Sequence, residues 1–209
     1  MMNSAAMGAR YRRIIIDYHA WRAGSGIAVK LLLAASLAVL TGVMAQVSIP
    51  LPWTPVPLTL QTFAVILGGL LLGRWGAVGQ VIYVCAGVAG LPWFAGARGG
   101  AAVLLGPTAG YLVGFVVAAY LIGSLVDRGR TAFPSLALAV AFVNLFLILG
   151  IGAGYLWLWL SFFQGRDAGL VDILGMGVLP FIPGAVIKTL LALAAARALF
   201  PGGAAENSE

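Results

Sequence analysis

Charged residues are scarce in this chain. They make up 9% of its 209 residues, whereas 62% of the residues are hydrophobic and the mean hydropathy is +1.04. Soluble domains carry about 25% charged residues, so this composition excludes an ordinary soluble protein and indicates a membrane protein. The length leaves room for six spans joined by short loops. We therefore expect no soluble ATPase, receptor or catalytic domain on this polypeptide.

The residues that build catalytic and metal sites are nearly absent too. The chain has one histidine and one cysteine, and no acidic residue falls inside a predicted span. A metal cluster, a carboxylate pair or a nucleophile with its base cannot be assembled within the membrane from this inventory. We expect no enzyme, no cofactor and no metal site. Ion-coupled carriers usually use an intramembrane carboxylate, which argues against a self-sufficient secondary carrier.

Long uncharged runs are what the chain has instead. They cover residues 31–73, 75–97, 99–126 and 131–165, and the last apolar stretch contains Lys188 as its one charge. About 20 apolar residues cross a bilayer core, so the first run is long enough for two spans separated by the proline-rich stretch 49–58.

These runs predict an all-α fold, a bundle of six transmembrane helices. The spans are expected near residues 27–47, 58–73, 76–91, 106–126, 133–162 and 178–199. A cytoplasmic N-terminal arm over 1–26 would precede this transmembrane domain of 27–199, and a cytoplasmic tail over 200–209 would follow it.

Basic residues mark one end of the predicted spans. Most of them lie in the arm, in the turns after the second and fourth spans and at the C-terminal end, whereas the opposite side carries Arg98 and Arg166. The positive-inside rule then places both termini in the cytoplasm. The net charge of +6 is spread thinly over the span ends, so we expect no nucleic-acid binding.

Lys188 is the charged residue that falls well inside a span, whereas Lys30 and Arg197 lie at span ends. A lysine at such a position costs about 2.5–3.5 kcal/mol on insertion scales and by default marks a functional site. Asp172 lies 16 residues earlier, beyond Pro180 and Pro183, which interrupt the helix. Either the lysine reaches toward the outer interface, or its partner is a ligand.

Other polar residues leave similar alternatives open. Arg98 lies in a glycine-rich loop over residues 91–100, where it is either a solvated loop charge or a forked donor to a ligand carboxylate. Neutral polar groups inside or near the spans either bind a ligand or tie helices together; they are Gln61, Tyr83, Tyr111 and Asn144.

Small residues recur every four positions on the first span, at Ala34, Ala38 and Gly42. Such a stripe allows two helices to approach closely. It serves either the internal packing of the bundle or the docking of a partner helix, and the periodicity by itself favours internal packing.

Four sequence stretches resemble one family. They are IPLPWTPVPLTLQT at 49–62, GLPWFAG at 90–96, LGPTAGY at 105–111 and LPFIPG at 179–184, the last followed by Lys188. Over residues 27–199 the chain closely resembles the BioY family, the biotin-binding S components of energy-coupling-factor (ECF) transporters. The resemblance implies a six-helix protein of the bacterial cytoplasmic (inner) membrane. Such a protein binds biotin from outside and works with a transmembrane coupling subunit and ATPase subunits.

The resemblance also implies roles for individual residues. Lys188 would contact biotin, and Ala34 with Ala38 matches a first-helix pattern that meets the coupling subunit, which favours docking over internal packing. Many relatives carry an acidic residue three positions before the lysine, where this chain has Ala185.

The chemistry of biotin suits a small cavity with cations, amides or hydroxyls and aromatic walls, because biotin has an anionic valerate, a polar ureido ring and an apolar thiophane ring. The predicted substrate-binding residues are Lys188, Arg98, Gln61, Tyr83 and Asn144, and Trp53, Trp93, Phe94 and Tyr83 are candidates for the walls. The alternatives are an S component for another small vitamin and a self-sufficient secondary carrier.

Overall fold

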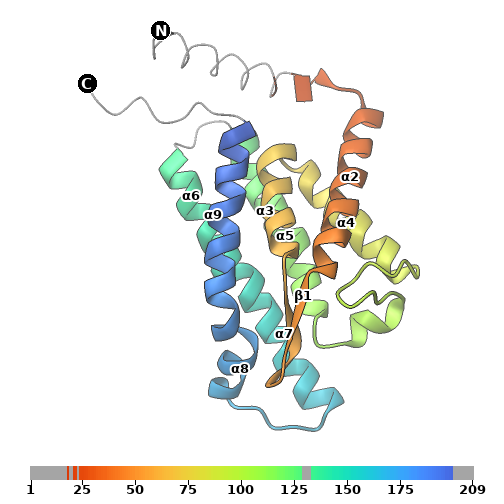
Figure 1. Ribbon diagram of the computed structural model, residues 1–209, viewed down its shortest axis with the longest axis vertical. Coiled ribbons are helices and arrows are strands. Elements are labelled where there is room, and N and C mark those ends of the chain that lie inside the picture. The colour runs from red at the N-terminus through yellow and green to blue at the C-terminus, as the bar shows by residue number, and fades with distance from the viewer. Residues whose placement is uncertain (1–17, 19–20, 23, 129–132, 200–209) are drawn as a thin grey trace.

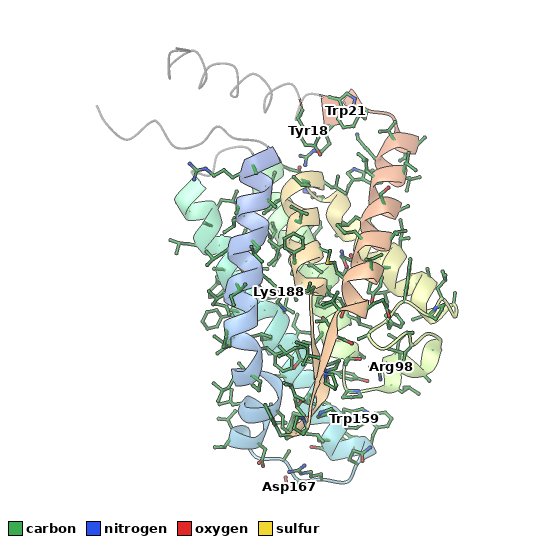
Figure 2. All side chains as sticks on the ribbon, viewed as in Figure 1. Tyr18, Trp21, Arg98, Trp159, Asp167 and Lys188 are labelled. Atoms are coloured by element: carbon green, nitrogen blue, oxygen red, sulfur yellow. The ribbon has the colours of Figure 1, made fainter. Side chains whose placement is uncertain are left out.

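The computed structural model describes residues 18, 21–22, 24–128 and 133–199 (Figure 1). Most of the predicted N-terminal arm and all of the predicted tail at 200–209 lie outside the described residues. Figure 2 shows Tyr18 and Trp21 at one end of the molecule and Trp159 and Asp167 at the other.

Long apolar helices form the frame of the bundle. Helix α2 spans Ile27–Gln46, α5 spans Ala109–Asp127, and α6 (Phe133–Phe142) continues through the π-helical turn η2 (Val143–Ile148) into α7 (Leu149–Phe163). Helix α8 (Leu170–Gly177) leads through the short turn η3 (Leu179–Phe181) into α9 (Ile182–Leu199). Among the described residues, 4 helical stretches are long and apolar enough to cross a membrane, and they match the first, fourth, fifth and sixth predicted spans.

Two further apolar helices are shorter. Helix α3 spans Gln61–Leu72 and α4 spans Trp75–Val88, so at a rise of about 1.5 Å per residue they are about 18 and 21 Å long. A bilayer core is about 30 Å thick. Neither helix reaches that length by itself, and the prediction of six transmembrane helices is therefore confirmed only in part.

A β-hairpin occupies the proline-rich stretch, which corrects the all-α prediction. Strand β1 (Ser48–Leu51) pairs antiparallel with β2 (Thr54–Thr59), with Ser48 opposite Thr59. Proline is excluded from helix interiors but tolerated on edge strands, and both strands of a hairpin are edges. The hairpin takes the residues expected to begin the second span, so α3 begins at Gln61 instead of residue 58.

Close packing of small residues joins α2 to α4. Ala34 and Ala38 are fully buried, and a Cβ atom added to Gly79 of α4 would lie 2.8 Å from the carbonyl oxygen of Ala34. The helices therefore approach to backbone contact at this point. Neither residue has accessible surface in this chain, which favours internal packing, and the docking of a coupling subunit by Ala34 and Ala38 stays a prediction.

Ion pairing closes the end of the bundle near Tyr18. Arg22 is buried, pairs with Asp127 at the end of α5 and donates a 3.0 Å hydrogen bond to the carbonyl oxygen of Leu71. The other Asp127 oxygen accepts the backbone N–H of Arg74 at 3.0 Å. The Tyr18 hydroxyl donates to the same Leu71 carbonyl at 3.0 Å, and burial raises the pKa of Tyr18 above its usual value. These bonds tie residues before α2 to the α3–α4 turn and to α5.

Candidate binding site

A cavity lies where the hairpin meets the bundle. It holds about 660 Å³ of empty space, counting the part open to solvent. Its walls come from β2, the start of α3, the segment between α4 and α5, α5 itself, η2 with the start of α7, and η3 with α9. Lys188 and Arg98, which both border the cavity, lie on either side of the hairpin in the view of Figure 2.

The apolar part of the wall is aromatic. Phe94, Phe115 and Phe181 border the cavity and are 2%, 4% and 6% exposed. Tyr111 also borders it, packs its ring 6.0 Å from that of Phe181 and donates its hydroxyl to the carbonyl oxygen of Gly177 at 2.7 Å. These rings offer a rigid surface to an apolar ring of a ligand.

Lys188 supplies a buried positive charge. It lies in α9, less than two turns after the helix begins at Ile182, and is 7% exposed. Its ammonium group donates a 2.9 Å hydrogen bond to the carbonyl oxygen of Thr59, and the ion pairs found among the described residues all involve Asp127 instead. The side chain therefore does not extend to the interface. A buried ammonium group held by a neutral carbonyl favours an anionic ligand.

Asn144 lies opposite α9 in the π-helical turn η2. It is fully buried and borders the cavity. Its amide nitrogen donates to the carbonyl oxygen of Ala185 at 3.1 Å and to the hydroxyl of Thr189 at 2.8 Å. Its side-chain oxygen has no hydrogen-bond partner among the described residues. Single π-helical turns inside α-helices occur frequently at functional sites.

Gln61 and Thr62 place further polar groups where α3 begins. The amide nitrogen of Gln61 donates to the Tyr83 hydroxyl at 2.8 Å, and its oxygen accepts the hydroxyl of Thr59 at 2.9 Å. Thr62 borders the cavity, and its buried hydroxyl has no partner within the described part of the chain. Sequence reasoning missed Thr62, although it directly follows Gln61 in the motif.

Arg98 stands at the mouth of the cavity. It is exposed and belongs to a tight loop in which Phe94 and Arg98 form a two-residue bridge. Its Nε donates to the carbonyl oxygen of Ala95 at 3.0 Å. The two terminal nitrogens of the guanidinium group make no hydrogen bond to the described residues and can meet an anion at the entrance. Gly96 in this loop has a positive φ, a backbone conformation that glycine adopts without strain.

Gln46 fixes this loop onto the end of α2. Its amide nitrogen donates to the carbonyl oxygens of Trp93 and Phe94 at 3.1 and 3.3 Å, and its oxygen accepts the N–H of Ala97 at 3.2 Å. No sequence motif pointed to this residue, because its role depends on a contact between positions about 50 residues apart.

Three predicted site residues do not border the cavity. Tyr83 is fully buried and packs its ring 5.3 Å from those of Trp93 and Phe94, and the Trp93 indole donates to the Tyr83 carbonyl at 3.0 Å. Tyr83 therefore supports the loop that carries Trp93 and Phe94. Trp53 lies in the hairpin turn and is 58% exposed. The expected aromatic walls are therefore corrected: Phe94 lines the cavity, whereas Trp53, Trp93 and Tyr83 do not.

The arrangement is suited to binding. One buried and one exposed cation, two carboxamides, hydroxyls and three phenylalanine rings border the cavity, and these groups match the chemistry of a small amphipathic anion. Within the described ranges no group of three or more histidine, cysteine, aspartate or glutamate residues could hold a metal.

Comparison with known sequences identifies the family. The sequence model of the BioY family matches residues 17–203. The chain belongs to the BioY family. A BioY relative from Methanothermobacter thermautotrophicus, described as a probable biotin transporter, is 47% identical over 139 residues, which are 65% of this chain and 88% of that protein. A second probable biotin transporter BioY, from Pyrococcus horikoshii, is 38% identical over 168 residues, or 80% of this chain and 93% of the relative.

A solved structure agrees with the BioY assignment. The crystal structure of the S-component for biotin from an ECF-type ABC transporter matches this chain with a TM-score of 0.72 and 27% sequence identity, covering 84% of this chain and 93% of the other. The chain is thus a membrane transporter component and not an enzyme.

Proposed function

We propose that this chain is the high-affinity biotin-binding S component of an ECF-type transporter and serves biotin uptake. The observation that carries the proposal is Lys188, a buried cation in the wall of the cavity, whose ammonium group donates to the neutral carbonyl oxygen of Thr59. A ligand carboxylate or ureido oxygen offers this ammonium group a stronger partner.

The three parts of biotin find matching surroundings. The anionic valerate and the ureido carbonyl can each meet a cation, and Lys188 and Arg98 both border the cavity. The ureido N–H groups find buried oxygens at Asn144 and Thr62 that have no partner within the described chain. The thiophane ring is apolar and suits the surface formed by Phe94, Phe115 and Phe181.

The membrane arrangement follows from charge and hydropathy. We assign six spans, with α3 and α4 as the second and third, in the bacterial cytoplasmic membrane and with both termini in the cytoplasm. The cavity, which lies toward the hairpin, then opens outward. A transmembrane coupling subunit and ATPase subunits are the partners.

Uptake of labelled biotin tests the proposal. The chain is expressed in a biotin-auxotrophic bacterial host that lacks its own biotin transporter, with and without the coupling and ATPase subunits. We expect biotin uptake that unlabelled biotin abolishes and that thiamine and riboflavin leave unchanged. Uptake of thiamine or riboflavin in place of biotin would assign the chain to another vitamin. Accumulation of biotin that dissipates with the ion gradient and needs no partner subunit would favour a secondary carrier.

A further inference from the structure

The side-chain oxygen of Asn144 is a buried acceptor in the cavity wall that accepts no hydrogen bond from the described residues. The residue itself has no accessible surface. Leaving a buried acceptor unpaired costs stability, so such a group in a native protein calls for a partner such as a water or a ligand. The empty space next to this side chain is the cavity.

The neighbours of Asn144 determine which amide atom is unpaired. The Thr189 hydroxyl donates to the carbonyl oxygen of Ala185 at 2.8 Å, so its hydrogen is already used. In this arrangement both α9 oxygens that face the amide can only accept, and the Asn144 nitrogen donates to them at 3.1 and 2.8 Å. A flipped amide would place oxygen against the Ala185 carbonyl, an unfavourable contact between two acceptors. The free atom is the oxygen.

The other charged and carboxamide side chains that border the cavity do not duplicate this acceptor. Lys188 and Arg98 only donate hydrogen bonds. The Gln61 oxygen already accepts the Thr59 hydroxyl at 2.9 Å. The unpartnered Thr62 hydroxyl can rotate to donate or to accept, whereas the Asn144 carboxamide oxygen accepts only.

We infer that Asn144 is a specificity-determining residue whose side-chain oxygen accepts a hydrogen bond from a ring N–H group of the ligand. The inference rests on the proposed function, because the ureido ring of biotin carries two such N–H groups. A site built around a buried acceptor strongly rejects an analogue that lacks the matching donor, since the acceptor is then left unpaired. Asn144 selects for a cyclic urea over a ring of the same shape without that N–H.

Asn144 also ties η2 to α9, so loss of affinity in a variant does not by itself identify a ligand contact. The readout is therefore a ratio of affinities. Biotin is compared with two cyclic carbamate analogues, in each of which a ring oxygen replaces one ureido N–H. The purified full chain should bind at least one carbamate about tenfold more weakly than biotin. The carbamate carbonyl is also a weaker acceptor, and the variants separate that effect.

The test variants are Asn144→Leu and Asn144→Ala, which both remove the oxygen, and the matched control is Thr189→Val. Thr189 does not border the cavity, and its replacement removes one bond of the Asn144 nitrogen while leaving the oxygen in place. We expect both Asn144 variants to lose at least about tenfold in biotin affinity and to show a smaller biotin-to-carbamate affinity ratio than the wild type, because only the effect of the weaker carbonyl remains. Thr189→Val should keep the wild-type ratio.

Several results would overturn the inference. Equal binding of biotin and both carbamates by the wild-type chain would show that no acceptor in the site distinguishes a ring N–H from a ring oxygen. This measurement does not depend on any variant. Asn144 variants that lose affinity for all ligands by one common factor would leave Asn144 with a packing role. A wild-type chain that binds no biotin would refute the proposed function instead, so the two failures are distinguishable.

Discussion

The ammonium group of Lys188 lies 2.9 Å from the main-chain carbonyl oxygen of Thr59, a residue 129 positions earlier in the chain. This hydrogen bond joins α9 to the end of β2 across the wall of the cavity. A neutral carbonyl only partly compensates a buried positive charge. An anionic or strongly accepting ligand is therefore a better partner for Lys188 than the protein itself provides.

Replacing Lys188 should weaken ligand binding more than it affects folding. Lys188→Met keeps the length of the side chain and removes its charge, so we expect biotin affinity to fall by at least about 1.5 kcal/mol, or about tenfold. Calorimetric titration of the purified variant measures this change. Lys30→Met on α2, which does not border the cavity, is the control and should bind normally. Unchanged affinity in Lys188→Met would show that the lysine does not contact the ligand.

Arg98 should act mainly through long-range charge. Because its side chain is exposed at the cavity mouth, we expect Arg98→Gln to lower affinity by about 1 kcal/mol or less. Raising the salt concentration should weaken wild-type binding more than binding by the variant, since salt screens exposed charges. Stopped-flow association at two ionic strengths measures the difference. Equal salt dependence in both proteins would remove Arg98 from the entrance path.

Gln46 should hold the loop that carries Phe94 and Arg98. Gln46→Leu removes the three loop contacts of this side chain, and we expect faster biotin dissociation with a nearly unchanged melting temperature. Ser36→Ala on the same helix is the matched control, because the Ser36 hydroxyl bonds only to the carbonyl of Leu32 among the described residues. If both variants release biotin at the wild-type rate, the loop is held in place by its other contacts.

The Ala34–Ala38 stripe should tolerate no added bulk. Changing both residues to leucine overpacks the contact between α2 and α4, and we expect a loss of about 1–3 kcal/mol in stability at each position together with weaker biotin binding. The control changes Val39 and Val43 to leucine on the exposed face of the same helix and should leave the melting temperature unaltered. A double Ala→Leu variant that is stable and binds biotin, yet cannot support uptake, would favour the docking assignment.

Sequence alone identified the groups whose chemistry is unusual for their position. Lys188 was evident as a charge in an apolar stretch, and Arg98 as the arginine of a glycine-rich loop. Gln61 and Asn144 were among the neutral polar groups expected inside or near the spans. All four border the cavity.

Contacts between distant segments could not be predicted in the same way. The prolines of the stretch 49–58 predicted a helix break, but not that the two halves would pair as a hairpin. Ala34 and Ala38 show a close-packing face without showing which helix covers it. Tyr83 and Trp93 are aromatic residues at or near the loop over residues 91–100. The sequence does not show which aromatic ring faces the cavity, and in the structure Phe94 lines it while Tyr83 packs against Phe94.

Equilibrium binding of radiolabelled biotin to the purified chain, without ATP and without partner subunits, tests the central claim most directly. We expect saturable binding of biotin that excess unlabelled biotin abolishes and that thiamine and riboflavin do not affect. Absence of saturable biotin binding by the folded protein, or equal displacement by thiamine or riboflavin, would contradict it.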